Sequence, residues 1–452
     1  MNKCNQVRRV DQLLALLITK GQGTPVRLAK LIENYCSISC ADQAYLLFQH
    51  FDHPNLLLFN TLIRCNPPHT SIRLFARGAS DSRIILDEFS YIYGFGACAR
   101  LRSLSSLCFG RQLHGSILKH GHRLDLQIGT TLIHFYGSTG RVDLGRQAFD
   151  EMPERNIITW NAMISGYCSH GVKEKQFIWD AIMLYKEMLA VDGLEMPNRT
   201  TMVCVLSAST QLSVIELGSC VHCCIEKIIY MPEGDVYIGT ALVDMYSKCG
   251  FLANALAVFD RMTSRNVLTW TAMATGFALH GQGEAALGFL DSMVQNRIMP
   301  NALTFTSVLS ACCHSGLIKE GIHLFHHMST KFSVERAIQH YGCVVNLLCK
   351  AGLLREAYQT IMEMEEKPDA VLWRILLNAC KSHGDATLGE KVGEILLKLQ
   401  PHKASAKADD PSEDYIALSN VFASAGKWQE VERVRHEMQV KMIHVKPGAS
   451  FC

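Results

Sequence analysis

The amino-acid sequence predicts an all-α fold, a right-handed superhelical α-solenoid of stacked helix-turn-helix repeats. The first observation is a phrase that occurs three times: FQHFDHPN at 48–55, FDEMPERN at 149–156 and FDRMTSRN at 259–266. The second is the apolar phrase that follows each copy: LLLFNTLIR, IITWNAMISGY and VLTWTAMATGF. The third is the spacing, because Phe48, Phe149 and Phe259 lie 101 and 110 positions apart, which fits three units of ~34 residues each. A solenoid of this kind acts through the surface that its stacked units display.

Residues 267–301 give the pattern of a single unit. Apolar residues recur there at steps of three and four, which predicts two helical faces. The first face consists of Trp270, Met273, Ala274 and Phe277, and the second of Ala285, Ala286, Phe289, Leu290 and Met293. Gly281 and Gly283 break the chain between them, and Pro300 ends the second helix. Such a helical hairpin cannot bury both faces alone and must stack on its neighbours.

The same landmarks divide residues 25–369 into successive units of 31 to 42 residues. The predicted units are 25–55, 56–87, 88–125, 126–156, 157–198, 199–235, 236–266, 267–301, 302–337 and 338–369. The longest is 157–198, and we expect residues 173–180 to lengthen its inter-helix turn. Residues 1–24 are predicted to hold a basic N-terminus and a partial first repeat.

Composition restricts the classes of partner. Lys and Arg number 44 against 42 acidic residues, a net charge of +2, whereas nucleic-acid binders usually have a basic surface. RNA recognition would therefore have to rest on placed polar groups and stacking. No apolar run approaches the ~18–20 residues that cross a bilayer, so no membrane partner is expected. The first ten residues, MNKCNQVRRV, are typical of an organellar presequence or are simply a basic N-terminus.

The sequence lacks the motifs of the enzymes that we considered. A zinc deaminase needs His-x-Glu and Pro-Cys-x-x-Cys, but none of the 19 histidines is followed two positions later by Glu, and no Pro precedes a Cys. Cys220, His222, Cys223 and Cys224 have no second ligand pair at finger spacing, so we interpret them as core residues of a helix. The 18 cysteines are interpreted as free thiols. We expect no metal, no cofactor and no catalytic site.

Four longer phrases resemble the pentatricopeptide repeat family, specifically its plant PLS class, in which long, normal and short repeats alternate. They are TALVDMYSKCG at 240–250, ITWNAMISGY at 158–167, TFTSVLSACCHSGLIKEG at 304–321 and HYGCVVNLLCKAGLLREA at 340–357. Residues 370–402 and 415–452 look like the two C-terminal E motifs of that class, with residues 403–414 as a flexible polar linker between them. No deaminase domain follows the second motif in the sequence.

The resemblance implies that each repeat reads one base with its fifth and its last residue. The implied pairs are Asn60 with Asp87, Thr130 with Asn156, Asn161 with Asn198, Thr240 with Asn266, and Thr271 with Asn301. Thr306 is a further candidate, although Ala337 ends its unit. The second residues Leu57, Ile158 and Leu268 are expected to pack against base faces. An alternative for Asn266 and Asn301 is that each is merely an N-cap of the next helix.

By the code of the family, Thr with Asn favours A, Asn with Asp favours U, and Asn with Asn favours C over U. The array then implies, from N- to C-terminus, U, unread, A, C or U, unread, A, A. The two unread units have Ile92 and Val203 at the fifth position. The pairs Ala29 with Asn55, Thr306 with Ala337 and Gly342 with Asp369 also depart from the readable pattern.

The resemblance implies a sequence-specific single-stranded RNA-binding protein that directs C-to-U editing of organellar transcripts. A separate deaminase-bearing pentatricopeptide repeat protein and accessory editing factors would be its protein partners. The expected location is the mitochondrion, with the chloroplast as the alternative. A second interpretation is RNA stabilisation, splicing or translation in the organelle. A third is a protein-binding scaffold of the tetratricopeptide type, which is also built from helical hairpins of ~34 residues.

Overall fold

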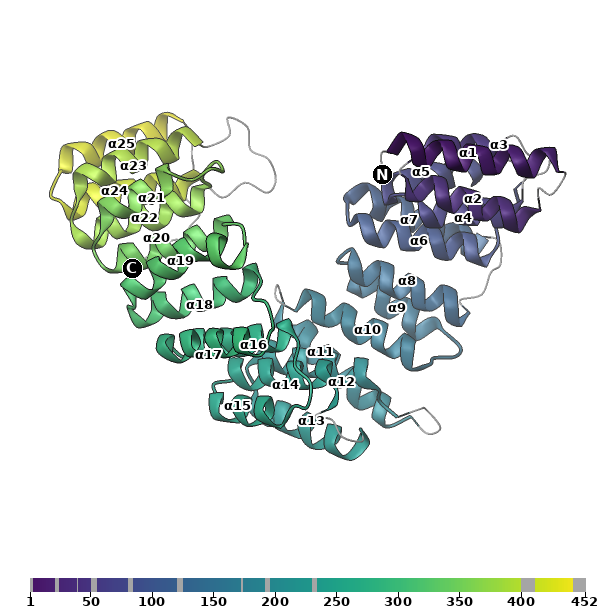
Figure 1. Cartoon of the computed structure of the whole chain (residues 1–452), viewed down its shortest axis with the longest axis horizontal. Coiled ribbons are helices and arrows are strands. Elements are labelled where there is room, and N and C mark those ends of the chain that lie inside the picture. Colours follow the sequence, from purple (N-terminus) through teal and green to yellow (C-terminus); the bar gives the residue numbers. More distant parts are fainter. Residues whose placement is uncertain are drawn as a thin grey trace. The chain divides into compact units, whose positions relative to one another are not determined.

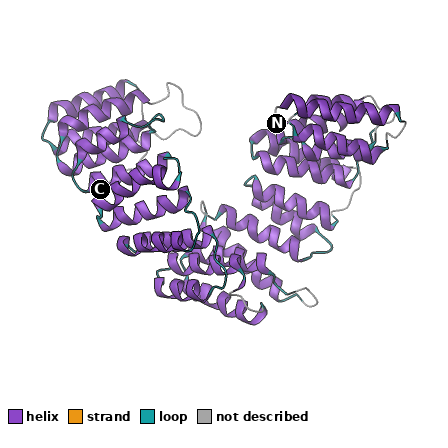
Figure 2. Ribbon diagram, in the orientation of Figure 1, coloured by secondary structure: helices purple, strands orange, loops and turns teal. Residues whose placement is uncertain are grey.

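The computed structural model describes residues 3–20, 24–38, 40–49, 55–79, 84–119, 125–171, 174–191, 196–229, 234–399 and 411–441. Within these ranges the structure contains 25 α-helices. No β-strand occurs in the described part of the chain, which confirms the predicted all-α fold (Figure 2). The chain divides into two compact units, Met1–Tyr230 and Met231–Cys452.

The first unit contains α1 (Lys3–Thr19), α2 (Pro25–Ser37), α3 (Ala41–Gln49), α4 (Leu56–Cys65), α5 (Pro68–Ala79), α6 (Glu88–Leu101), α7 (Leu104–Lys119), α8 (Leu126–Ser138), α9 (Val142–Glu151), α10 (Ile157–His170), α11 (Lys175–Leu189), α12 (Arg199–Leu212) and α13 (Ile215–Ile228). The second contains α14 (Val236–Lys248), α15 (Leu252–Arg261), α16 (Val267–Leu279), α17 (Gly283–Gln295), α18 (Ala302–Ser315), α19 (Ile318–Phe332), α20 (Ile338–Lys350), α21 (Leu354–Met362), α22 (Ala370–His383), α23 (Ala386–Leu399), α24 (Pro411–Ser424) and α25 (Trp428–Val440).

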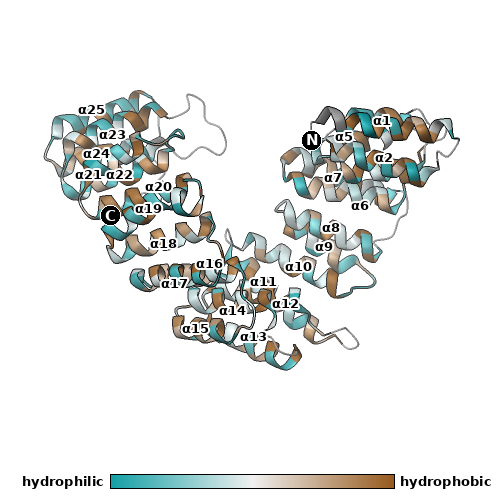
Figure 3. Ribbon diagram, viewed as in Figure 1, coloured by the Kyte–Doolittle hydropathy of each residue, from teal (hydrophilic) through white to brown (hydrophobic). Residues whose placement is uncertain are grey.

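Each unit has two layers of helices (Figure 1). The even-numbered helices are the first helices of the hairpins, and they pack directly on one another: α4 lies between α2 and α6, and α16 between α14 and α18. Most odd-numbered second helices pack on their own first helix and on the next one of the same unit, as α9 does on α8 and α10. A first helix therefore has neighbours on several sides, while a second helix keeps a wide exposed face. Hydrophilic and hydrophobic residues alternate along the helices (Figure 3).

The recurring phrase FDEMPERN joins one hairpin to the next. Phe149 packs edge-on against Trp160 of the following first helix, with ring centroids 4.9 Å apart. Arg155 lies over the Phe149 ring at 4.7 Å and donates hydrogen bonds to the carbonyls of Phe149 (2.8 Å) and Asp150 (3.0 Å). The phrase therefore connects the end of α9 to the start of α10. The same contacts occur at FDRMTSRN, so the repeated phrase marks the junction between successive repeats.

The methionine of the same phrase explains a glycine one helix earlier. A Cβ atom built on Gly129 would lie 2.6 Å from Sδ of Met152, and one built on Gly239 would lie 2.5 Å from Cε of Met262. Non-bonded contacts of a Cβ atom are essentially never this short, so a methyl group at either glycine would displace the methionine side chain. Both methionines are buried. Glycine is needed there for close packing.

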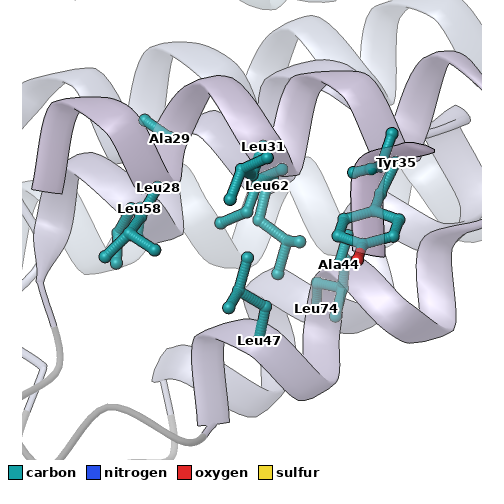
Figure 4. Packing of buried hydrophobic residues seen from close by; sticks show 11 residues of the cluster. Leu28, Ala29, Leu31, Tyr35, Ala44, Leu47, Leu58, Leu62 and Leu74 are labelled. Atoms are coloured by element: carbon teal, nitrogen blue, oxygen red, sulfur yellow. The ribbon is translucent and has the colours of Figure 1, made fainter. Parts of the chain in front are cut away.

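At the N-terminal end, α2 to α5 enclose a common apolar cluster (Figure 4). The labelled side chains are Leu28, Ala29, Leu31 and Tyr35 of α2, Ala44 and Leu47 of α3, Leu58 and Leu62 of α4, and Leu74 of α5. The phenol of Tyr35 also donates a 2.6 Å hydrogen bond to Asp11 of α1. Residues 3–10 of the basic N-terminal segment thus belong to helix α1, which packs on α2.

Two details of the turns differ from the sequence prediction. Residues 175–180 lie in helix α11 and not in the turn before it; residues 172 and 173 lie outside the described residues. With 15 residues against 13 in α17, α11 takes up only part of the extra length of unit 157–198. Gly281 does adopt a positive φ of 63°, as a turn glycine should. Gly283, however, is the first residue of α17, and a Cβ there would lie 2.7 Å from side-chain atoms of Leu317 and Ser315.

The C-terminal end differs as well. Helix α24 begins at Pro411, whereas the sequence placed residues 403–414 in a linker and began the second E motif at 415. The reason is that Ser412 and Asp414 are buried against neighbouring helices, so the polar sequence that suggested a linker is internal. The rest of the predicted linker lies outside the described residues. Among the helices that the structure describes, none has the length and apolar character of a membrane span.

Candidate functional site

The fifth and last residues of five predicted units come together in the structure. Each fifth residue lies on a first helix, and each last residue is the N-cap of the next first helix. The caps are Asp87 on α6, Asn156 on α10, Asn198 on α12, Asn266 on α16 and Asn301 on α18. The N-cap alternative that the sequence offered for Asn266 and Asn301 is therefore correct as a structural role. It does not exclude a second role.

Two pairs bond directly because asparagine is long enough to reach the cap. The Nδ2 of Asn60 donates to both carboxylate oxygens of Asp87, at 3.0 and 3.3 Å. The Nδ2 of Asn161 donates to Oδ1 of Asn198 at 3.2 Å. The partners are 27 and 37 residues apart in the sequence.

Where the fifth residue is threonine, a second hydroxyl bridges the gap. Thr271 Oγ1 lies 2.8 Å from Thr304 Oγ1, and Thr304 Oγ1 donates to Oδ1 of Asn301 at 3.0 Å. The same three-membered chain occurs twice more. It links Thr240 through Thr269 to Asn266, and Thr130 through Thr159 to Asn156. Sequence reasoning missed these bridging residues, although each is the third residue of its unit.

The fifth residues are more enclosed than a reading surface suggests. Asn60 and Asn161 are each 7% exposed, and Thr271 is 3% exposed, since neighbouring first helices cover them. The cap residues lie further out, and Asn198 and Asn266 are exposed. Among the described residues, the Nδ2 groups of Asn156, Asn198, Asn266 and Asn301 have no hydrogen-bond partner. In the four pairs that end in Asn, the cap residue therefore has an amide donor without a partner.

Asp87 provides the one charged member of these pairs. Burial raises the pKa of its carboxyl group, but the hydrogen bonds from Asn60 and Ser90 outweigh that effect, and the net pKa is lowered. Asp87 consequently remains an acceptor at neutral pH. The cap at this junction presents a carboxylate oxygen where the other four present an amide.

The predicted apolar second residues lie on the surface. Leu57, Ile158 and Leu268 are 45%, 61% and 55% exposed, although each begins an otherwise buried helix. The same position holds further exposed apolar side chains that the sequence analysis did not name: Phe89, Tyr237, Leu303 and Val371. The sequence could have identified them, because each is the second residue of its unit. In four of the five units with a polar pair, an exposed apolar side chain stands at the second position (Leu57, Ile158, Tyr237 and Leu268); in unit 126–156 the second residue is Gln127. The surface therefore offers both apolar contacts and hydrogen-bonding groups.

Thr306 is not part of such a pair. Its hydroxyl donates to the carbonyl of Ala302 in its own helix at 3.0 Å. Ala337 has no side-chain group to cap α20, and His340 accepts the Ala337 N–H at 2.9 Å instead. Across this junction Cys343 Sγ donates to the backbone carbonyl of Thr306 at 3.7 Å, but among the described residues the Thr306 side chain has no partner on α20.

The cysteine-rich stretch of α13 has no arrangement for holding a metal. Cys220 and Cys223 are exposed, and His222 Nε2 lies 3.7 Å from Glu226 of the same helix. In the described residues no group of three or more His, Cys, Asp or Glu side chains is placed to bind a metal ion. The exposure of Cys220 and Cys223 differs from the predicted core position; the helix turns these residues away from its neighbours.

Comparison with known proteins identifies the repeats. The E motif family matches residues 383–452, the PPR repeat family matches residues 265–314, and single PPR repeats match 130–157, 158–175, 240–267, 303–331 and 340–368. A pentatricopeptide repeat-containing protein of Arabidopsis thaliana is 47% identical over 450 residues, which cover 98% of this chain and 95% of that protein. Another, named chloroplastic/mitochondrial, is 34% identical over 99% of this chain and 70% of its own length.

Solved structures show the same fold. The crystal structure of the pentatricopeptide repeat protein PPR10 in complex with an 18-nt psaJ RNA element superposes with a TM-score of 0.72 at 17% identity. The superposition covers 96% of this chain but only 62% of that chain. The crystal structure of PPR10 from maize superposes with a TM-score of 0.68 at 16% identity and covers 95% of this chain and 61% of that chain. The predicted resemblance is confirmed: this chain belongs to the pentatricopeptide repeat family and carries its E motif.

Proposed function

We propose that the chain binds single-stranded RNA sequence-specifically and selects sites for C-to-U editing in organellar transcripts, with the deaminase supplied by a separate protein. The observation that carries the proposal is the set of five coupled polar pairs, each at the junction of two successive first helices. The units with these pairs also expose apolar side chains at the second position, among them Leu57, Ile158 and Leu268.

The chemistry of the pairs suits the edges of unpaired bases. Helical-repeat RNA readers use two or three side chains for one base, and a well-placed bidentate pair is worth ~1–3 kcal/mol of discrimination. Aromatic stacking adds ~1–3 kcal/mol per base, and the aliphatic Leu57, Ile158 and Leu268 should add less. We infer the preferred series U, unread, A, C or U, unread, A, A from the N- to the C-terminus.

Relatives support the wider context. PPR10, which has the same fold, was crystallised in complex with an 18-nt psaJ RNA element. Relatives are named chloroplastic/mitochondrial or chloroplastic, which supports an organellar location, with the mitochondrion as our preferred organelle. The E motif supports editing, since the class with E motifs resembles editing factors that recruit a deaminase.

The binding part of the proposal is tested with the purified full chain. An RNA oligonucleotide that carries U-N-A-C-N-A-A should bind more tightly than a scrambled one of equal composition, and the affinity should fall as salt increases. If the chain binds neither RNA but captures proteins, a tetratricopeptide-like scaffold role replaces the proposal.

The editing part requires a plant that lacks the gene. Sequencing of mitochondrial and chloroplast transcripts should show at least one cytidine that is no longer edited, just 3′ of a match to the predicted series. A defect in transcript length or splicing with normal editing at every site would instead favour the second candidate, RNA stabilisation or splicing.

A further inference from the structure

The first helices of the hairpins carry almost no acidic residues. Helices α4, α8, α10, α12, α16, α18, α20 and α22 contain no Asp or Glu, whereas second helices such as α9 and α11 contain several. Aspartate occurs instead at some N-caps, such as Asp87. Among the helical residues, acidic side chains are thus concentrated in the second-helix layer. An anion that approaches the first-helix layer meets little like-charge repulsion, since exposed charges more than ~8–10 Å away are largely screened.

A cavity of about 230 Å³ lies in this layer, where the C-terminal halves of α8 and α10 meet the turn after α6. All of its lining residues belong to the first compact unit. Three of them are basic, namely Arg102, His134 and His170, and the others are glycine, alanine and serine. No acidic side chain of the described residues lines the cavity. Its charge therefore favours an anionic ligand.

Two glycines keep the cavity open. A Cβ atom built on Gly137 of α8 would lie 3.1 Å from Cα of Gly166 on α10, and one built on Gly166 would lie 3.4 Å from Cα of Gly137. At the same unit positions in α14 and α16, Ser247 faces Gly276, where a Cβ would lie 2.5 Å from the serine Oγ. The backbones of α8 and α10 therefore approach closely, and backbone forms part of the cavity wall.

The cavity continues the helix face that carries the fifth residues. His134 and Ser138 follow Thr130 at four-residue steps on α8, and both line the cavity. Ser165 and Ser169 occupy the corresponding places on α10 and line it too. Residues four apart share one face of a helix, each about 6 Å further along its axis. A nucleotide whose base contacts Thr130 can therefore extend its sugar and phosphate along α8 to the cavity.

Two of the basic groups at the cavity are available to a ligand. The side chains of Arg102 and His134 are exposed, and neither has a hydrogen-bond or ion-pair partner among the described residues. The other polar groups are engaged: His170 Nδ1 donates to a backbone carbonyl of α10 at 3.2 Å, and the hydroxyls of Ser138 and Ser169 donate to carbonyls of their own helices. A guanidinium suits phosphate, because its planar N–H groups can bond two oxygens in parallel.

We propose that this cavity binds one phosphodiester group of the RNA backbone, with the Arg102 guanidinium as its charged partner and the His134 imidazole as a second donor. The inference rests on the proposed RNA binding. A phosphate carries no base information, so the site adds affinity for any sequence and fixes the position of the strand on the array. The expected ligand is a linkage beside the first A of U-N-A-C-N-A-A, the base assigned to the unit of Thr130.

The purified full chain tests the proposal with U-N-A-C-N-A-A oligonucleotides. Arg102→Gln should weaken binding of this sequence, and of one with G in place of the first A, by the same factor. One phosphate contact contributes ~0.7 to the slope of log affinity against log salt for a single strand. The loss caused by Arg102→Gln should therefore shrink by about 2.5-fold between about 50 and 200 mM salt.

A neutral linkage in the RNA locates the contact. The oligonucleotide is made with a methylphosphonate at each linkage in turn. With the neutral linkage beside the first A, Arg102→Gln should cause no further loss of affinity. His134→Ala should weaken the all-phosphate oligonucleotide and have no effect on the same neutral one. Arg73→Gln is the matched control, because it removes an exposed arginine of second helix α5 and should change neither affinity nor salt dependence.

Unchanged affinity in Arg102→Gln, an equal loss in Arg73→Gln, or a loss that no neutral linkage removes would overturn the inference and leave the proposed RNA binding intact. If thermal melting shows that Arg102→Gln does not fold, His134→Ala decides by the same criteria. A site for free phosphate would also overturn it: inorganic phosphate would then raise the melting temperature of the unchanged protein but not of Arg102→Gln, with equal RNA affinities. If the unchanged protein binds no oligonucleotide, the proposed RNA binding itself is rejected.

Discussion

Arg374 of α22 and Asp414 of α24 form a two-point ion pair, with Nε 2.6 Å from Oδ1 and Nη2 3.1 Å from Oδ2. Arg374 is the fifth residue of its helical segment, the position that Asn60, Asn161 and Thr271 hold in the repeats. The stacking of first helices thus continues into the matched E motif region, but a charged pair closes the position where the repeats offer a polar edge. We expect no base to be read there.

Breaking this ion pair should destabilise the second unit. The Asp414 side chain is 2% exposed and that of Arg374 is 22% exposed. Removal of one member of a buried pair costs about 3–5 kcal/mol, and the partial exposure of Arg374 favours the lower end for Asp414→Ala. The double variant Arg374→Met, Asp414→Leu should recover most of the loss. Urea unfolding measures both, and equal stability of the single variant and the unchanged protein would contradict the prediction.

The Asn301→Asp variant should shift the preference at its position from A towards G. A carboxylate accepts a hydrogen bond from the ring N–H of G, whereas the Nδ2 of asparagine donates to the ring nitrogen of A. The cap is retained, because Asp caps α22 and α8 in this chain. Melting temperature should hardly change. Asn296→Asp, at an exposed helix end, is the control; a uniform loss of affinity would identify Asn301 as a cap only.

Trp270→Ala should cost about 3–5 kcal/mol of unfolding free energy. The ring is 3% exposed and packs 4.9 Å from Phe259 and 4.6 Å from Phe289, measured between ring centroids. Trp428 is 66% exposed, so Trp428→Ala should change stability by less than about 0.5 kcal/mol. Similar losses in both variants would show that Trp270 does not hold the inter-repeat joint.

Arg265→Lys should destabilise although the charge is kept. The Arg265 guanidinium lies 4.5 Å from the Phe259 ring centre and donates to the carbonyls of Phe259 (2.8 Å) and Asp260 (2.9 Å). Lysine cannot make this forked contact, and hydrogen bonds to a charged group are worth ~1.5–3 kcal/mol. Thermal unfolding compares it with Arg297→Lys, a change at an exposed arginine, which should have little effect.

Acid should weaken the Asp87 junction. The folded pKa of Asp87 is lowered from its usual 3.8, because hydrogen bonds from Asn60 and Ser90 favour the charged form. A lowered folded pKa means that its stabilisation is fully present above 3.8 and is lost as pH falls through the folded pKa. The stability difference between the unchanged protein and Asp87→Asn should therefore shrink on acidification below pH 3.8. A difference that does not vary with pH would argue against a lowered pKa.

Periodicity sufficed for the hairpins, since Trp270, Met273 and Phe277 lie in the buried face where the three- and four-residue spacing put them. The resemblance to a repeat family indicated that Asn60 pairs with Asp87 and Asn161 with Asn198, and both hydrogen bonds are present. It did not show that Thr159, Thr269 and Thr304 bridge the threonine pairs, because a buried threonine on a helix resembles any other core residue in sequence.

By itself, the sequence determined the repeat, its period and the caps Asn266 and Asn301, because these depend on contacts within about 34 residues. Only the tertiary structure decided how the fifth residues are covered and where α24 begins. Those features depend on side chains from successive hairpins, such as Arg374 and Asp414, 40 residues apart. A hydrogen bond across a stacking interface has no local pattern, so it appears only when the helices are packed together.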